Sequence, residues 1–105
     1  MTDTQTLKEN RRAVTTDYDA PAMWRVVFHN DDVTPAGFVA AILQKVYDYD
    51  VERAIAAVTR IGVEGQGVVG VYLKAVAVLK KRITDGASRT AGYPLKVTIE
   101  REENQ

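Results

Sequence analysis

The sequence contains no cysteine and only one histidine, His29, among its 105 residues. Without thiols the chain has no disulfide, no thiolate zinc site and no cysteine nucleophile, and a single histidine deprives most catalytic triads of their base. No nucleophile, base and orienting partner can be assembled from the remaining residues. We therefore expect a binding protein that is not an enzyme.

Net charge and long apolar runs are absent as well. Fourteen Lys and Arg balance fourteen Asp and Glu, which argues against sequence-independent electrostatic binding to nucleic acid. No segment approaches the ~20 apolar residues that span a bilayer, and the N-terminus has no apolar run of signal-peptide length. These features predict a cytoplasmic protein with no nucleic-acid or membrane partner. A domain of balanced charge gives no dimer signal, so we assume a monomer.

The length suits one small core domain beside a flexible tail. Residues 1–22 are polar, carry charges of both signs and show no sustained apolar period. We expect these residues to form a flexible N-terminal arm, and residues 23–105 to form the core domain.

Apolar periodicity predicts six elements in the order β-α-α-β-α-β. Alternation with period two indicates the strands, and apolar residues three and four apart indicate the helices. The fold class is α+β, with a three-stranded antiparallel-rich sheet packed against three helices on one face. The strands are expected at 23–28, 68–72 and 95–99, and the helices at 35–47, 51–61 and through 72–83.

The sequence also predicts helix ends, the position of one strand in the sheet and the apolar face of each helix. Asp50 is a plausible N-cap of the second helix, and Gly62 is expected to end it. The strand at 68–72 is expected at the centre of the sheet, with Gly70 allowing a close approach by a helix or backbone. Apolar faces are expected at Phe38, Val39, Ile42, Leu43 and Val46 in the first helix, Val51, Ala54, Ile55, Val58 and Ile61 in the second, and Tyr72, Val76, Leu79 and Ile83 in the third.

A polar corner separates the first strand from the first helix. Asn30, Asp31 and Asp32 follow the strand, and Thr34 before Pro35 is expected to cap the helix. Three interpretations are open. The side-chain oxygens satisfy backbone amides in a turn, bind a cationic donor such as an ammonium group, or hold a metal. The metal is disfavoured because no further Asp, Glu or His lies at ligand spacing, so we expect no metal and no cofactor.

Two further patterns have simple explanations. The glycines of residues 63–67 lack the lysine and hydroxyl of a phosphate-binding loop. Basic residues cluster on the third helix, where they form either a solvated face or a docking patch for an acidic partner. These residues are Lys74, Lys80, Lys81 and Arg82.

The corner Asn-Asp-Asp-Val-Thr-Pro, read with residues 49–54 (Tyr-Asp-Val-Glu-Arg-Ala), 70–72 (Gly-Val-Tyr) and 93–95 (Tyr-Pro-Leu), resembles the ClpS family. ClpS is the bacterial adaptor of the Clp protease, and the match runs from about Met23 to Glu100. The resemblance implies a domain like the C-terminal module of the ribosomal stalk protein. Members bind the first residue of a substrate, usually Phe, Tyr, Trp or Leu, and deliver it to the AAA+ unfoldase ClpA of the ClpAP protease.

By similarity, Asn30 and Asp31 would receive the substrate's α-ammonium, while Asp32 and Thr34 would shape the corner. An α-amino group with a pKa near ~7.7 to 8.0 is mostly charged at neutral pH. An apolar hole gains ~1.5 to 3 kcal/mol by burying one large side chain. The resemblance assigns Val39, Val58, Ile61 and Leu95 to the lining of that hole, and Lys80 to unfoldase docking.

The chain departs from the family pattern at three positions. Gly62 replaces a histidine that helps hold the α-ammonium, and one hydrogen bond to a charged group is worth ~1.5 to 3 kcal/mol. Ala36 replaces a methionine at the pocket rim, which predicts a larger hole and weaker exclusion of β-branched first residues. Ala75 replaces a glutamate thought to face the unfoldase. The alternative function is a ClpS-like protein that docks to or inhibits a Clp-type unfoldase without binding first residues, with a shallow or filled pocket.

Overall fold

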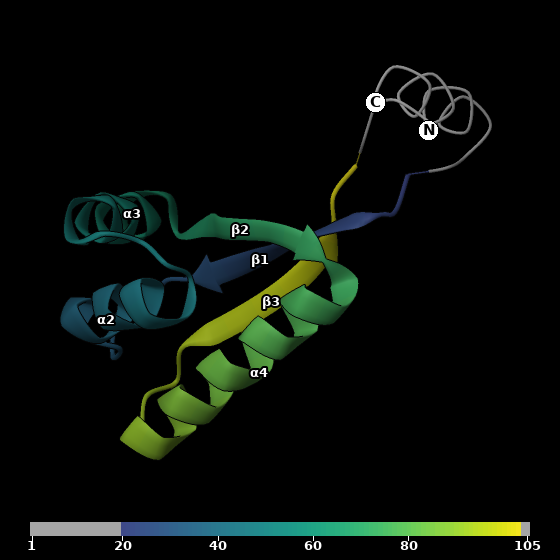
Figure 1. Cartoon of the computed structure of the whole chain (residues 1–105). Helices are drawn as coiled ribbons and strands as arrows, with labels where there is room; N and C mark the ends of the chain where they lie inside the picture. The colour runs from purple at the N-terminus through teal and green to yellow at the C-terminus, as the bar shows by residue number, and fades with distance from the viewer. Residues whose placement is uncertain (1–19, 104–105) are drawn as a thin grey trace, which may run out of the picture.

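The computed structural model describes residues 20–103, which form a three-stranded antiparallel sheet with three helices. The element order and the α+β class predicted above are confirmed. Figure 1 shows α4 running along the sheet, and α2 and α3 side by side where β1 ends. In chain order the elements are β1 (Met23–His29), α2 (Ala36–Val46), α3 (Val51–Glu64), β2 (Gln66–Leu73), α4 (Lys74–Ala91) and β3 (Lys96–Arg101).

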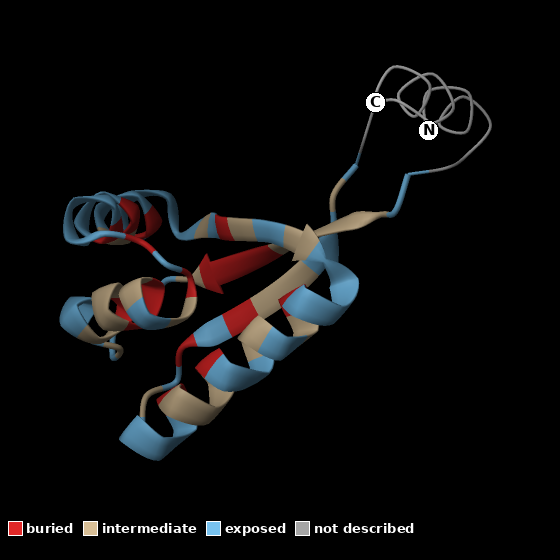
Figure 2. Ribbon diagram, viewed as in Figure 1, coloured by how far each residue is buried: buried red, intermediate tan, exposed pale blue. Residues whose placement is uncertain are grey.

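The core lies between the sheet and the helices, where the buried segments of Figure 2 meet. Val26 and Phe28 of β1 and Leu43 of α2 are completely buried. The ring of Phe28 packs edge-on against Tyr47, with ring centroids 5.4 Å apart. Val27 on the opposite face is buried too, while Arg25 and His29 beside it on that face are half-buried, so the strand departs from its predicted alternation only at Val27.

The sheet order is β2-β1-β3, which places β1 at the centre. The prediction of a central strand at residues 68–72 is therefore wrong, because β2 is an edge strand. Its β-branched residues Val68 and Val71 remain partly exposed. Gly70 does permit a close approach, but the approaching group is the phenol of Tyr72, which lies where a Cβ would be.

Helix α3 begins as predicted and ends later than predicted. The Asp50 side chain caps it by accepting a hydrogen bond from the Arg53 backbone N–H, 2.7 Å away. The helix continues past Gly62 to Glu64, and Gly65, with φ of 89°, is the left-handed residue that ends it. The extra turn faces solvent, as Val63 at 82% exposure shows, so it has no apolar period to mark it.

Helix α2 buries the large residues Val39, Ile42 and Leu43 of its predicted face, whereas α3 and α4 bury mainly small ones. On α3 the predicted face is only partly used, because Val51 and Ile55 are each 57% exposed. On α4 the predicted stripe is wrong, since Val76, Leu79 and Ile83 are all exposed. Small side chains let a helix backbone approach its neighbours closely, which the large residues would prevent. The buried residues are Ala54, Ala57 and Ile61 on α3, and Ala77, Thr84 and Ser88 on α4.

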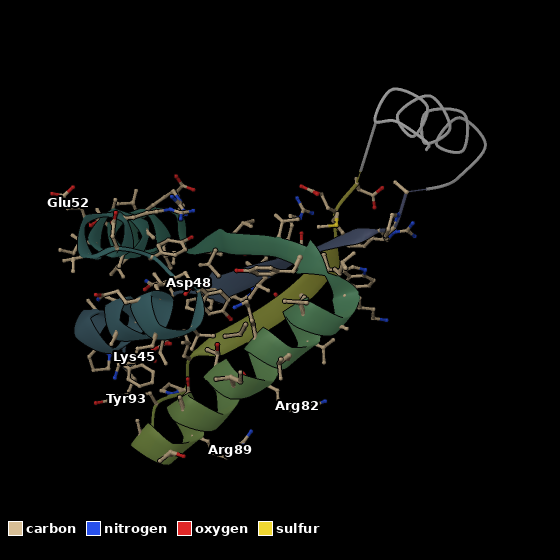
Figure 3. All side chains as sticks on the ribbon, viewed as in Figure 1. Lys45, Asp48, Glu52, Arg82, Arg89 and Tyr93 are labelled. Carbon is tan, nitrogen blue, oxygen red and sulfur yellow. The ribbon has the colours of Figure 1, made fainter. Side chains whose placement is uncertain are left out.

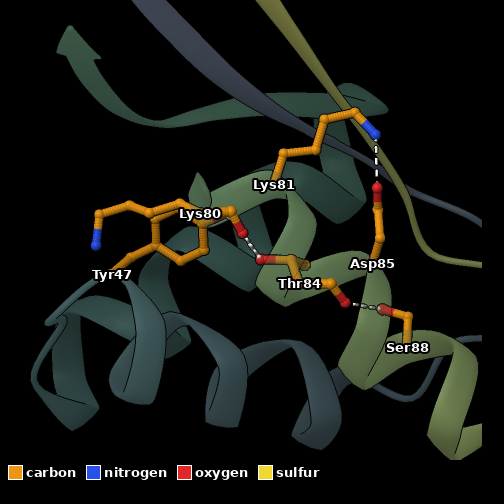
Figure 4. Close-up of polar contacts among 6 residues, drawn as sticks. All are labelled: Tyr47, Lys80, Lys81, Thr84, Asp85 and Ser88. Atoms are coloured by element: carbon orange, nitrogen blue, oxygen red, sulfur yellow. Dashed lines mark hydrogen bonds and ion pairs between the residues drawn. The ribbon is translucent and has the colours of Figure 1, made fainter. Parts of the chain in front are cut away.

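Polar contacts join α4 to the end of α2 (Figure 4). The Tyr47 hydroxyl lies 2.9 Å from the Thr84 hydroxyl. The Lys80 ammonium donates to the backbone carbonyl of Val46 at 2.6 Å. Thr84 itself donates to the Lys80 carbonyl, and Ser88 donates to the Thr84 carbonyl. Each buried hydroxyl of this group therefore has a partner, as burial of a polar group requires.

Residues 1–19 lie outside the described residues, so the predicted arm at 1–22 stays a prediction, and β1 begins at Met23. Among the described helices, none combines the length and apolarity that crossing a membrane requires.

Candidate functional site

The corner between β1 and α2 is organised by the carboxylate of Asp31. It accepts hydrogen bonds from the backbone N–H groups of Val33 at 2.8 Å and Thr34 at 2.6 Å, and from the Thr34 hydroxyl at 2.8 Å. Thr34 does not cap α2, because the helix begins one residue later than predicted, at Ala36. Pro35 occupies the N-cap position with no side-chain cap, and the predicted Thr34 cap is wrong.

The same contacts set the charge of the corner. Burial raises the pKa of Asp31, but the hydrogen bonds from Thr34 and Val33 outweigh it and hold that pKa below its ordinary value of 3.8. A carboxylate that accepts several hydrogen bonds favours its charged form. Asp31 is therefore an anion at neutral pH.

Asn30 connects this corner to the end of α3. Its backbone N–H donates to the carbonyl of Gly65, which caps α3, over 2.9 Å. The C-terminal end of a helix carries a partial negative charge. The corner therefore combines a carboxylate, an exposed amide side chain and a negative helix end, all of which favour a cation.

A cavity of about 240 Å³ opens beside the corner, between β1, α2, α3 and the loop before β3. All residues predicted to bind the substrate N-terminus line it except Asp32, which is exposed and lies outside it. Phe28 and His29 line it too, and the sequence does not predict this, because only the tertiary arrangement of α2, α3 and the loop before β3 near the end of β1 brings them to a cavity. The lining consists of Phe28, His29, Asn30, Asp31, Thr34, Ala36, Val39, Val58, Ile61, Gly62 and Leu95.

The cavity lining combines the polar corner residues with apolar side chains from α2, α3 and the loop before β3. Val39, Ile61 and Leu95 are buried side chains that form apolar wall. Tyr93, labelled in Figure 3, packs against Phe38 of α2 with ring centroids 4.9 Å apart, and this contact anchors the loop that carries Leu95. Among the described residues, Asp31 is the only carboxylate in the lining, and no lysine or arginine joins it. Such a cavity suits a ligand with a cationic head and an apolar side group.

The family described as ATP-dependent Clp protease adaptor protein ClpS matches residues 19–98 of the chain. The chain belongs to the ClpS family. It is 40% identical to the ClpS adapter of Leptothrix cholodnii over 82 residues, which cover 78% of this chain and 71% of that protein. It is also 40% identical to the ClpS adapter of Helicobacter hepaticus over 82 residues, which cover 78% of this chain and 83% of that protein.

A solved ClpS structure shares the fold. The structure of Agrobacterium tumefaciens ClpS2 bound to L-phenylalaninamide matches with a TM-score of 0.77 and 29% sequence identity. The match covers 79% of this chain and all of that chain. The ClpS resemblance noted in the sequence is therefore confirmed at the level of both family and fold.

Gly62, where the resemblance implies a histidine in other family members, lines the cavity and is exposed. A Cβ built there meets no described atom within 4 Å beyond its own stretch of helix. The chain's histidine, His29, lines the same cavity, and its ring nitrogen Nε2 pairs with the Thr98 hydroxyl at 2.9 Å. Position 62 thus offers space but no side-chain acceptor.

Lys80, the predicted ClpS docking residue, lies on α4 away from the cavity. Besides its bond to Val46, its ammonium lies 5.5 Å from the Tyr47 ring centroid and 5.2 Å from that of Tyr72. These contacts hold α4 against α2, so Lys80 has a structural role, and its docking role stays a prediction. Within residues 20–103, no group of three His, Asp or Glu comes together as a metal site.

Proposed function

We propose that this ClpS-family chain is an adaptor that binds the first residue of a substrate protein and delivers that protein to a ClpA-type unfoldase. We propose that it acts as a monomer in the cytoplasm and has no catalytic activity of its own. The observation that carries the proposal is the cavity that joins the Asn30–Asp31 corner to apolar walls.

The corner has the capacity to accept an ammonium group. A carboxylate has about four acceptor positions, and the hydrogen bonds to Asp31 use three of them, two at Oδ1 and one at Oδ2. One position at Oδ2 remains for an α-ammonium or for a bridging water. The amide oxygen of Asn30 supplies a second acceptor. An N-acetylated chain has no ammonium to donate, so acetylation is the natural test of this contact.

The apolar part of the cavity suits one large side chain. L-Phenylalaninamide, the ligand of the related ClpS2 structure, has a free amine, a benzyl group and an amide where the next peptide bond would begin. It therefore has the chemistry of an N-terminal phenylalanine. Burial of such a side chain is worth ~1.5 to 3 kcal/mol, which supports a preference for large apolar first residues.

For delivery, we propose that the surface of α4 near Lys80 contacts the unfoldase. Ala75 stands where the family glutamate is expected, and it is exposed on the first turn of α4. Because alanine has no carboxylate, we expect either weaker binding to ClpA or binding to a different Clp-type unfoldase.

Fluorescence-anisotropy titration tests the binding step. Labelled peptides that start with Phe, Leu, Trp or Arg are compared with N-acetylated copies, using wild type, Asn30→Ala and Asp32→Ala. We expect micromolar binding that acetylation abolishes. Asn30→Ala should weaken it about tenfold or more, because a hydrogen bond to a charged group is lost. Asp32→Ala is the matched control, since Asp32 lies outside the cavity.

The second candidate function is favoured by one observation, the absence of an acceptor side chain at Gly62. In that case the chain docks to or inhibits a Clp-type unfoldase without holding first residues. Binding that is absent, or that acetylation leaves unchanged, would favour this candidate over the adaptor.

A further inference from the structure

A second hollow lies next to the cavity, between α2 and α3. It has a volume of about 250 Å³ and shares Ala36 and Val58 with the cavity lining. We refer to this hollow as the α2–α3 groove. Its lining consists of Ala36, Gly37, Ala40, Ile55, Val58 and Thr59.

The groove is apolar except at one residue. Thr59 is the one polar side chain among the described lining residues, and its hydroxyl already donates to the Ile55 carbonyl at 3.0 Å. Ile55 is 57% exposed, although its position in the sequence predicts a core residue. A large apolar side chain that the core does not use, beside a hollow without charge, suits an apolar ligand.

We propose that the groove binds the third residue of a substrate whose first residue occupies the cavity, and that it prefers an apolar side chain there. This inference rests on the proposed function. In an extended chain successive side chains point to opposite sides, and the rise is ~3.3 Å per residue. The first and third side chains therefore point the same way, ~6.6 Å apart, while the second points away from the protein.

Ala36 and Val58 line both hollows, so the two hollows are adjacent, as side chains ~6.6 Å apart on one peptide require. Ala36 contributes a single methyl group, so little side-chain bulk separates the groove from the cavity. On α3 the shared residue Val58 is three positions from Ile55, an axial separation of ~4.5 Å at 1.5 Å per residue. One extended tripeptide is long enough to reach both hollows. The occupant is then fixed by covalent continuity with the residue in the cavity.

The test compares peptides that start with Phe and differ only at the next two positions: Phe-Ser-Ser, Phe-Leu-Ser, Phe-Ser-Leu and Phe-Ser-Lys, each on a common serine-rich tail with a C-terminal dye. We expect Phe-Ser-Leu to bind about three- to tenfold more tightly than Phe-Ser-Ser, as partial burial of one leucine allows. Phe-Leu-Ser should bind like Phe-Ser-Ser.

Two variants make the test specific to the groove. Ile55→Glu places a carboxylate in the groove without disturbing the core, and should reverse the order so that Phe-Ser-Lys binds more tightly than Phe-Ser-Leu. Val51→Glu is the matched control, because Val51 lies on the same helix with the same 57% exposure but does not line the groove. Val51→Glu should bind Phe-Ser-Leu more tightly than Phe-Ser-Lys, as wild type does.

The outcomes separate this inference from the function on which it rests. If Phe-Ser-Ser binds and acetylation abolishes its binding, the proposed function stands. In that case, two results overturn the groove as a third-residue subsite. One is tighter binding of Phe-Leu-Ser than of Phe-Ser-Ser. The other is that Ile55→Glu still binds Phe-Ser-Leu more tightly than Phe-Ser-Lys. If no peptide shows acetylation-sensitive binding, both are overturned.

Discussion

Replacing Gly62 by histidine is the sharpest perturbation of the proposed amine site. Position 62 lines the cavity within α3, and a Cβ there meets open space. The helix has ordinary, negative φ at this residue, because only Gly65 and Gly92 among the described glycines have positive φ. Histidine therefore fits without backbone strain, and its neutral ring offers a nitrogen as an acceptor for the α-ammonium.

The expected gain follows from one added hydrogen bond. A bond to a charged group is worth ~1.5 to 3 kcal/mol, and each ~1.4 kcal/mol is tenfold in affinity. Gly62→His should therefore bind a Phe-starting peptide roughly tenfold to a hundredfold more tightly. The gain should vanish at about pH 5.5, because an imidazole with an ordinary pKa of ~6.5 is then mostly a cation that repels the ammonium.

Anisotropy titrations at about pH 7 and about pH 5.5 measure both effects, since the α-ammonium is charged at either pH. Gly62→Ala is the first control. It should leave affinity unchanged and raise the free energy of unfolding by about 0.5 to 1 kcal/mol, because glycine inside a helix is unfavourable. Val63→His is the second control and adds an imidazole one residue outside the cavity lining. Equal affinity of Gly62→His and Gly62→Ala, or a gain that persists at the lower pH, would refute the reasoning.

Three further predictions concern the rim, the corner and the α2–α4 contact. Ala36→Met should bind Ile- and Val-starting peptides less well than wild type does, relative to Phe; equal rejection by both proteins in competition titrations would contradict this. Asp31→Asn should lower the free energy of unfolding by about 1 kcal/mol near neutral pH. The folded pKa of Asp31 lies below its ordinary value of 3.8. The stability that the Asp31 carboxylate adds is therefore complete above pH 3.8 and is lost as the pH falls through the folded pKa. In urea melts, the difference in free energy of unfolding between wild type and Asp31→Asn should narrow in acid and not widen. Burial raises the pKa of Tyr47 from 10.0 to about 12, so wild type should lose stability as the pH rises between those values. Burial raises the pKa of Tyr72 as well, so Tyr47→Phe should lose less stability than wild type in alkaline denaturant melts, and an equal loss would contradict this prediction.

Local signals predicted much of the chain well. The Asp50 cap, the turn residues of the corner and the order of the six elements depend on contacts between residues close in sequence, and these can be recognised without a structure. Asn30 and Asp31 were singled out by the same kind of signal. Local signals do not predict the apolar wall of the cavity, because Val39 and Leu95 have the spacing of ordinary core residues. Only the ClpS resemblance assigns these two residues to a cavity.

The sequence alone therefore determines the order of the elements, the polar corner and the family, since each depends on local periodicity or a specific motif. It does not determine where the helices end, because α3 and α4 continue to Glu64 and Ala91, beyond the expected ranges. Tertiary structure decides the position of β1 at the centre of the sheet, because strand order depends on which buried faces meet. It also decides that α4 buries Ala77 and leaves Leu79 exposed, because close packing admits small side chains at this contact. The cavity arises in the same way, where α2, α3 and the loop before β3 meet without filling the space beside Asp31.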